Sequence, residues 1–120
     1  MSLNKFQFIG NLTRDTHVRY TGSDSRALAM FDLAVNEEWR DRASGEKREK
    51  TNYFRIKLWD SLAKNAGKYL GKGSSVFIDG HIENTKYEKN GEIQYGQDFV
   101  ADSVQYLNTK APSGQQSDDE

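Results

Sequence analysis

Two aromatic and two basic side chains alternate along residues 51–60, at the two-residue spacing that places them on one face of a β-strand. They are Tyr53, Arg55, Lys57 and Trp59. Aromatic rings provide flat apolar faces on which bases stack, and cations neutralise phosphates. A face of this kind suits a ligand that is flat, apolar on its faces and carried on a negatively charged backbone. Single-stranded nucleic acid is such a ligand.

The alternate positions of the same stretch are apolar and predict that it is a central strand. Phe54, Ile56 and Leu58 would face a hydrophobic core while the aromatic and basic set faces the surface. A tryptophan at the end of a strand also commonly packs the rim of a core, and that alternative stays open for Trp59. The stretch therefore predicts one buried face and one face available to a ligand.

Positive charge is concentrated in the middle of the chain, although the net charge is only -1. Residues 39–57 carry seven Lys or Arg against three acids, a local excess of four. Because a local patch meets phosphates, this segment is the favoured contact with a nucleic-acid backbone. Arg55 and Lys57 are the first predicted phosphate contacts, and ordinary solvated charge is the alternative for most of the others. Those others are Arg40, Arg42, Lys47, Arg48, Lys50, Lys86 and Lys89.

Length and composition indicate one domain of 120 residues. Hydrophobic content of 35% and a mean hydropathy of -0.90 are low for a compact monomer. Part of the chain is therefore expected to be a solvated loop or tail, or a partner subunit completes the core. Cysteine is absent, which excludes disulfides and thiol catalysis. With no apolar stretch of membrane-spanning length and no signal-peptide pattern, we expect a cytoplasmic protein without membrane contact.

Residues that could carry catalysis or bind metal are scattered. His17 and His81 lie far apart, with no Glu or His at metal-ligand spacing beside them, so surface or hydrogen-bonding roles are favoured. The segment 71–74 (GKGS) has Ala66 where a phosphate-binding loop needs glycine, and it follows a helix instead of preceding one. We therefore expect no enzyme activity, no catalytic residue, no metal and no cofactor.

Hydrophobic periodicity predicts an all-β domain with one short helix. The helix follows Trp59, with Asp60 or Ser61 as its N-cap, and Asn90-Gly91 predicts a tight hairpin. Glycines within strands predict bends of the kind that a curled sheet needs. This order matches an OB-fold, a five-stranded Greek-key barrel with one short helix between strands 3 and 4. The predicted strands are 4–12, 27–37, 51–60, 75–83 and 93–107, with 18–21 as a further strand or extended arm.

A series of motifs resembles the bacterial-type single-stranded DNA-binding protein family, known as SSB. The resemblance covers about residues 3–107, with the motifs in the family's order. They are NKxxxIGNLTRD, VRYT, FDLAVNEEWRD, GEK, TNYFRIKLW, LAKNAGKYLGKGSSVFIDG and TKYEKNG.

The resemblance implies an OB-fold domain over residues 1–108 that binds single-stranded DNA without strong sequence preference. It implies base stacking on Trp39, Tyr53, Trp59 and Tyr87, of which Tyr53 and Trp59 also follow from alternation. The assignment of Trp39 rests mainly on the resemblance, and Tyr87 could instead cover a cross-strand neighbour. Family members act in DNA replication, recombination and repair.

Family members also usually assemble as homotetramers, by pairing their first strands and packing their sheets. Phe6, Phe8 and Phe54 are the expected apolar oligomer interface. Residues 109–120 are expected to be a disordered acidic stub. Because the chain ends in two Asp and a Glu without the family's terminal Pro-Phe, recruitment of replication and repair proteins through that tip is doubtful.

Two other functions fit the same barrel. One is a replication-restart or protein-interaction subunit, although such a module does not need rings alternating with cations. The other is an RNA-binding OB module, because the sequence does not reveal whether any group reads the 2′-hydroxyl.

Overall fold

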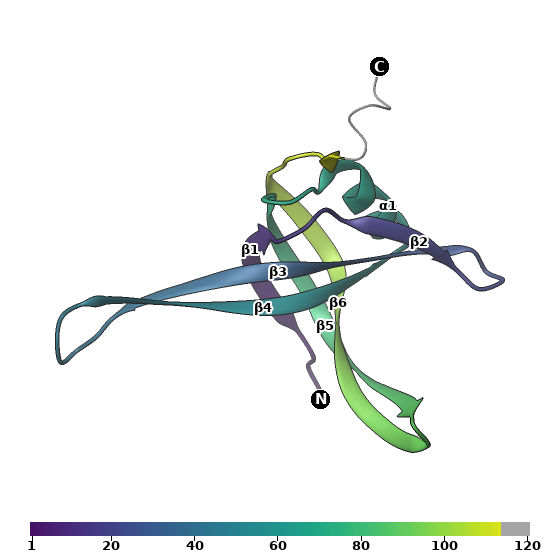
Figure 1. Cartoon of the computed structure of the whole chain (residues 1–120), viewed down its shortest axis with the longest axis horizontal. Helices are drawn as coiled ribbons and strands as arrows, with labels where there is room; N and C mark the ends of the chain where they lie inside the picture. The colour runs from purple at the N-terminus through teal and green to yellow at the C-terminus, as the bar shows by residue number, and fades with distance from the viewer. Residues whose placement is uncertain (114–120) are drawn as a thin grey trace.

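The computed structural model describes residues 1–113 and consists of six strands and one helix. In Figure 1 the strands curl into a small barrel from which long hairpins project, with the helix beside one end of the barrel. The elements are β1 (Phe6–Leu12), β2 (His17–Thr21), β3 (Arg26–Arg40), β4 (Lys47–Trp59), α1 (Asp60–Tyr69), β5 (Ser75–Lys89) and β6 (Glu92–Asn108).

The strand order closes a five-stranded barrel. The sheet runs β1-β5-β6-β4-β3-β2, and β1 pairs a second time with β3, where Asn11 lies opposite Ala34 and Leu12 opposite Leu33. All pairings are antiparallel except the short parallel contact between β4 and β6. This is the OB-fold that the sequence predicts. Residues 17–21 form a strand of their own, β2. The helix expected after the third barrel strand therefore follows the strand that is numbered β4.

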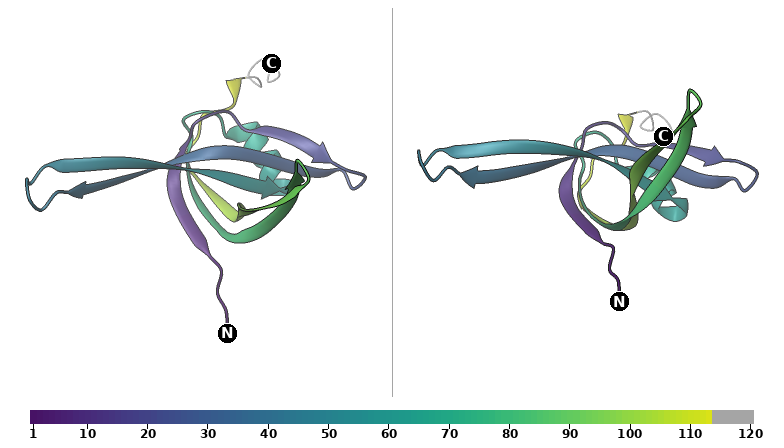
Figure 2. Two further views of the ribbon diagram at one scale, coloured as in Figure 1. Left: turned by 60° about the horizontal axis from the view of Figure 1, so that its bottom comes forward. Right: turned by 90° about the horizontal axis from the view of Figure 1, so that it is seen from below.

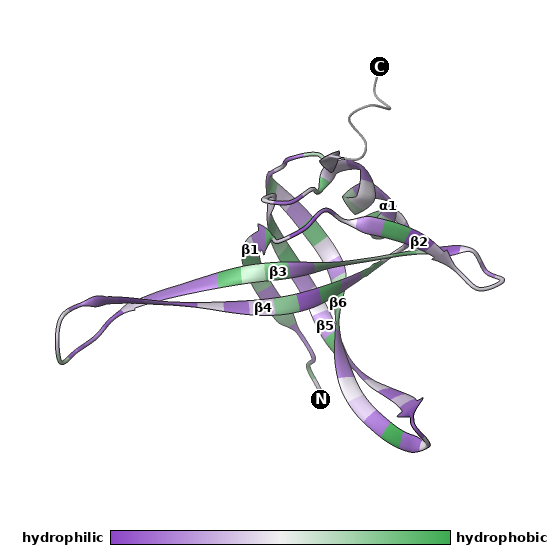
Figure 3. Ribbon diagram, in the orientation of Figure 1, coloured by the Kyte–Doolittle hydropathy of each residue, from purple (hydrophilic) through white to green (hydrophobic). Residues whose placement is uncertain are grey.

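The barrel interior is filled by the apolar side chains that alternate along the strands. Leu33, Ile56, Leu58, Val76 and Ile78 are fully buried. Figure 3 shows that hydrophobic positions gather on the barrel strands, whereas the hairpins that leave the barrel are mostly hydrophilic. One face of β4 therefore packs against the core, and its other face lies at the surface.

The β3–β4 hairpin is longer than predicted. The predicted strands 27–37 and 51–60 leave residues 38–50 outside both, yet β3 and β4 pair as far as Arg40 opposite Lys47. Polar contacts support this extension, including a hydrogen bond from Thr51 Oγ1 to Asn36 Oδ1 at 2.6 Å and an ion pair between Lys47 and Glu38 at 3.2 Å. The views in Figure 2 show this hairpin and the β5–β6 hairpin projecting from the barrel in different directions.

Two local predictions at the ends of α1 and β6 need correction. Trp59 occupies the N-cap position of α1 without a side-chain cap, and the carboxylate of Asp60 pairs with Arg26. After β6 the chain stays attached, because Lys110 exchanges hydrogen bonds with Ser74 Oγ, and Ser113 donates to Asp15. Lys110 and Ser113 are therefore held against the domain, and the acidic residues of the expected stub lie outside the described part of the chain. No helix of residues 1–113 is long and apolar enough to span a membrane.

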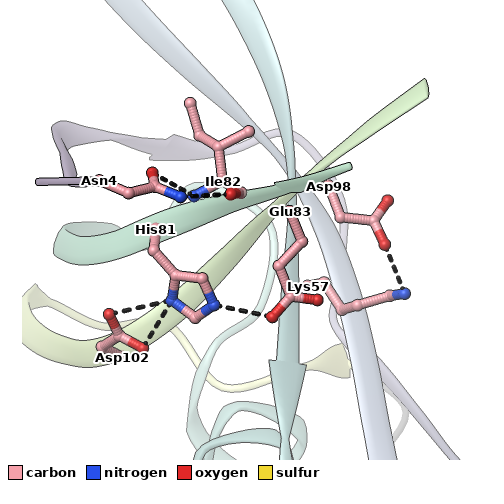
Figure 4. A network of polar contacts seen from close by, with 7 residues as sticks. All are labelled: Asn4, Lys57, His81, Ile82, Glu83, Asp98 and Asp102. Carbon is pink, nitrogen blue, oxygen red and sulfur yellow. Dashed lines mark hydrogen bonds and ion pairs between the residues drawn. The ribbon is translucent and has the colours of Figure 1, made fainter. Parts of the chain in front are cut away.

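A three-residue ionic network crosses β5 and β6 beside the N-terminal strand (Figure 4). His81 Nε2 lies 2.8 Å from Glu83 Oε2, and His81 Nδ1 lies 3.0 Å from Asp102 Oδ1. Both ring nitrogens can donate only when the imidazole is protonated. The hydrogen bond to Glu83, followed by that to Asp102, therefore raises the pKa of His81.

This network predicts a stability contribution that depends on pH. A pKa that is higher in the folded state stabilises the fold below the unfolded value of about 6.5, and the contribution disappears as pH rises through the folded pKa. We expect His81→Gln to lower the free energy of unfolding by about 1 kcal/mol or less near pH 5.5, and by less near pH 9. Denaturant titrations of both proteins at the two pH values measure this difference. An effect of His81→Gln that grows with pH would contradict the assignment.

Candidate nucleic-acid interface

The outward face of β4 carries the aromatic and basic side chains that alternate in the sequence. Tyr53 is 67% exposed, while Ile56 and Leu58 on the opposite face are fully buried. Arg55 is exposed, and Lys57 is partly buried. The core anchors one side of the strand, so the other side is held at the surface as a rigid platform.

Strand pairing extends this face across β3 and β2. Cross-strand partners share a face of the sheet, so outward residues of the three strands form transverse rows. The first row is Trp59, Leu28 and Arg19, in which Leu28 is covered and the other two reach the surface. The second is Lys57, Met30 and His17; Arg55 then pairs with Asp32, and Tyr53 with Ala34. We call these residues the β4 face. Arg19 and Met30 were not expected in the site. The place of Arg19 depends on the pairing of β2, which the sequence left as either a strand or an arm, whereas Met30 joins the face through its position opposite Lys57 in the β3–β4 pairing.

Trp59 is partly buried and carries a guanidinium on its ring. Arg26 Cζ lies 4.4 Å from the centroid of the indole ring, in the geometry of a cation–π contact. Asp60 holds this guanidinium through two hydrogen bonds of 3.2 and 2.9 Å. Asp60 itself has a positive φ of 57°, an uncommon conformation for a residue with a side chain. The guanidinium of Arg26 is therefore held over the indole ring at the end of the β4 face.

The two central cations of the β4 face are already paired with carboxylates. Arg55 Nε donates to Asp32 Oδ1 at 3.0 Å, and this hydrogen bond raises the pKa of Arg55. Lys57 Nζ lies 2.7 Å from Asp98 Oδ2 (Figure 4). Because only Nε of Arg55 is engaged in the described residues, its terminal nitrogens can still meet a phosphate. The ammonium of Lys57 has three N–H donors, so a phosphate can meet it beside Asp98, although the Asp98 carboxylate offsets part of its charge.

The remaining predicted cations divide into paired and unpaired groups. Lys47 pairs with Glu38, Arg48 pairs with Asp41 and Glu46, and Arg40 donates to the carbonyl of Gly45. Within residues 1–113 no ion pair forms at the exposed side chains of Arg42, Lys50, Lys86 and Lys89. All of these residues lie on the two long hairpins or the loop at their tip, away from the barrel wall.

The four predicted stacking residues do not share one flat surface. Trp39 is 49% exposed near the tip of the β3–β4 hairpin, but it pairs with Arg48 and so faces the side opposite to Tyr53. Tyr87 is 54% exposed and lies opposite Gln94 on the β5–β6 hairpin. The structure brings Tyr53 and Trp59 together on β4 and places Trp39 and Tyr87 on separate arms.

The β5–β6 hairpin also exposes two apolar side chains that the sequence analysis missed. Tyr95 lies opposite Lys86, and Ile93 lies opposite Glu88, on the face of the hairpin opposite to Tyr87. Their alternation along residues 93–95 was visible in the sequence. The sequence analysis placed both residues in the predicted strand 93–107 without assigning them a face, and only the structure shows that the hairpin has left the core at this point.

Of the three phenylalanines predicted at the oligomer interface, one is buried within its own chain. Phe6 is 7% exposed and packs in its own chain's core, where Gly80 lacks a side chain and leaves room for the ring. Phe8 stacks on Phe54 with ring centroids 4.2 Å apart, and both contact Phe99. Phe8 and Phe54 remain partly exposed, so these two can contribute to an interface, whereas Phe6 offers little surface to a second chain.

Replacing Asp98 tests whether its carboxylate restrains Lys57. We expect Asp98→Asn to strengthen binding of a single-stranded oligonucleotide up to about fivefold at low salt, because surface ion pairs are worth about 1 kcal/mol or less. Fluorescence anisotropy with labelled oligo(dT) measures this change. Asp79→Asn removes the same charge from a pair with Lys5 that lies off the β4 face. Equal effects of the two substitutions would mean that only net charge matters.

The fold and this surface place the chain among OB-fold proteins with an aromatic and basic strand face. Sequence comparison matches residues 3–107 to the Single-strand binding protein family, and the chain belongs to that family. Among the described residues, no group of three or more His, Cys, Asp or Glu is arranged to hold a metal.

Solved structures of the same family resemble the chain closely. A Plasmodium falciparum SSB in complex with ssDNA has a TM-score of 0.77 and 27% identity, over 90% of this chain and 97% of that one. A deletion mutant of the single-stranded DNA binding protein from Thermus aquaticus has a TM-score of 0.77 and 29% identity, over 90% of this chain and 54% of that one. The wild-type Thermus aquaticus protein has a TM-score of 0.76 and 32% identity, over 88% of this chain and 50% of that one. This chain therefore spans about half the length of the two Thermus chains.

Proposed function

We propose that this protein binds single-stranded DNA without strong sequence preference and protects it during replication, recombination and repair. The observation that carries the proposal is the β4 face, where Tyr53 and Trp59 flank Arg55 and Lys57 in a member of the single-strand binding protein family. The Plasmodium falciparum relative is described in complex with ssDNA. Stacking accepts any base, because every base has a π-face, so sequence preference is expected to be weak.

Binding begins with the cations of the hairpins, which attract the strand and release its counterions. One base stacks on Tyr53, and a second meets the stack of Trp59 and Arg26, since a guanidinium plane also accepts a base. Between these bases the terminal nitrogens of Arg55 contact a phosphate, and the remaining N–H groups of Lys57 contact another. Duplex DNA keeps its bases in the interior of the helix, so it gains only the electrostatic part of this interaction.

The long hairpins supply further contacts for a longer strand. Trp39 and Tyr87 offer rings on two separate arms, and Arg42, Lys50, Lys86 and Lys89 offer cations along those arms. A strand that follows the β4 face and then either arm would remain near rings and cations throughout. We assign Arg40, Lys47 and Arg48 a weaker role, because each is engaged by its own hairpin.

We propose a homo-oligomer, with a tetramer as the expected form. The edge of β1 along Phe6–Gly10 pairs with β5 on one side only, and Ile9 is exposed on this strand. Phe8 and Phe54 lie partly exposed beside it. An open strand edge with apolar neighbours favours pairing with a second copy. Sedimentation analysis measures the assembly, and a monomer at all concentrations would overturn this part of the proposal.

The function is tested by titrating the protein with oligo(dT), oligo(U) and duplex DNA at two salt concentrations. We expect tight binding of oligo(dT), quenching of tryptophan fluorescence, and weak binding of duplex. The logarithm of the binding constant should fall with that of salt concentration by about 0.7 for each phosphate contacted. Preference for oligo(U) would favour an RNA-binding module, and equal affinity for duplex would contradict stacking as the source of binding.

A further inference from the structure

A second surface with rings and cations lies between α1 and β2, on the side of β2 away from the β4 face. We call this surface the α1–β2 groove. Its lining combines an exposed tyrosine, two lysines and several small or polar side chains. The lining residues are Val18, Tyr20, Ser61, Lys64, Asn65, Gly67 and Lys68.

Close packing of the helix against β2 builds this groove. Val18 and Tyr20 alternate on β2 and face α1, and a side chain at Gly67 would overlap Val18 Cγ2. Glycine at this position therefore lets the helix and the strand approach closely. Val18 fills the contact, and Tyr20, one alternation further along the strand, is left 61% exposed at the groove.

The cations of the groove differ from Arg55 and Lys57 of the β4 face in having no carboxylate partner among the described residues. Lys64 and Lys68 lie one helical turn apart and are both exposed. Neither forms an ion pair within the described part of the chain, whereas Arg55 and Lys57 are each held by a carboxylate. An arriving phosphate displaces no carboxylate here. An exposed ring in one groove with two free ammonium groups has the chemistry of a stacking site with phosphate contacts.

The groove is continuous with the β4 face around the open edge of the sheet. The row of Trp59, Leu28 and Arg19 runs across the strands to β2, which pairs only with β3. Arg19 and Tyr20 are consecutive on β2 and therefore project to opposite faces. A strand that crosses the sheet along this row reaches Arg19, passes the edge of β2 and arrives at Tyr20 and Lys64.

We propose that the α1–β2 groove is a second contact for single-stranded DNA, in which Tyr20 stacks on a base and Lys64 and Lys68 each bind a phosphate. It extends the path of a strand that is already bound on the β4 face, and it rests on the proposed function. Charge complementarity favours a polyanion, and the exposed ring of Tyr20 together with the continuity with the β4 face favours a nucleic acid over an acidic polypeptide. Oligonucleotides too short to leave the β4 face should not use the groove.

The test compares a short oligo(dT) of about six nucleotides with one of about 16, lengths within the range that one OB-fold covers. We expect Tyr20→Ala to weaken binding of the long oligonucleotide at least about fivefold and to leave the short one unchanged. The double substitution Lys64→Gln, Lys68→Gln should reduce the salt slope for the long oligonucleotide by about 1.4. Tyr20→Trp and the double lysine-to-arginine variant should restore binding.

Tyr69→Ala is the matched control, because Tyr69 is an exposed tyrosine of the same helix that lies toward Tyr106 and outside the groove. Thermal melting of each variant checks that the fold is retained. If the groove variants bind the long oligonucleotide as the wild type does while Tyr53→Ala weakens both lengths, the groove is not a DNA contact and the function stands. If Tyr53→Ala also has no effect, the proposed function and the extended path both fail.

Discussion

Replacing Tyr53 by alanine is expected to weaken oligo(dT) binding by about 1–3 kcal/mol, or roughly five- to 150-fold, because each stacked base contributes about that amount. Tyr53 is mostly exposed and belongs to the barrel wall instead of a hairpin tip, so its removal takes away a platform while the strand beneath it stays in place. Trp59→Ala should have a comparable effect. It removes the indole ring and also leaves Arg26 without the surface on which its guanidinium lies. Anisotropy titrations at fixed salt measure both losses.

Conservative variants distinguish stacking from a general loss of structure. Tyr53→Phe keeps the ring and should bind within about twofold of the wild type, since stacking does not need the hydroxyl group. Arg26→Gln keeps the indole and removes only the guanidinium above it, so a loss smaller than that of Trp59→Ala is expected. Unchanged affinity in the double variant Tyr53→Ala, Trp59→Ala would refute the role of the β4 face.

Replacing Gly80 by alanine is expected to destabilise the fold by about 3 kcal/mol, at the upper end of the usual cost of overpacking. A Cβ atom at Gly80 would overlap the backbone carbonyl of Val100 and would lie 2.7 Å from Cε2 of Phe6. The carbonyl belongs to the neighbouring strand β6 and cannot turn away without disturbing the pairing of β5 and β6. Denaturant unfolding measures the loss.

Gly96→Ala is the control for this prediction. Gly96 is also a glycine of the β5–β6 hairpin, but a Cβ atom there would meet only the side-chain hydroxyl of Thr85, at 3.0 Å. We expect Gly96→Ala to change stability by less than about 1 kcal/mol. If both alanine variants were equally stable, crowding at Gly80 would not explain the presence of glycine at that position.

The structure could be predicted from the sequence where a strand or helix packs against the hydrophobic core, because burial imposes a regular pattern of apolar residues. The alternation of Phe54, Ile56 and Leu58 placed β4 correctly, because a strand with one buried face must alternate. Asn90 and Gly91 both have positive φ, which explains why this pair forms the predicted tight hairpin turn. The OB-fold could be predicted from the order of the strands and the helix, because each of these elements buries one apolar face and so shows a regular hydrophobic period.

The long hairpins and the ion pairs could not be predicted in the same way. The tip of the β3–β4 hairpin is solvated on both faces, so its strands carry no apolar alternation and resemble a loop in the sequence. The partners of the site cations come from distant segments, with Asp98 lying 41 residues from Lys57. The space beside Gly80 that accepts the ring of Phe6 exists only after β1 and β5 have paired. The sequence does not reveal that space, so Phe6 was expected at an interface between subunits.

Photo-crosslinking tests the central claim most directly, because it reports which side chains lie against the bases. A single-stranded oligonucleotide containing 5-bromouracil is bound, irradiated and digested, and the crosslinked residues are identified by mass spectrometry. We expect crosslinks at Tyr53 and Trp59, which disappear when competing unlabelled oligo(dT) is added. Efficient crosslinking confined to residues outside the β4 face, such as those around His81 and Asp102 on β5 and β6, with none at Tyr53 or Trp59, would contradict the role of the β4 face.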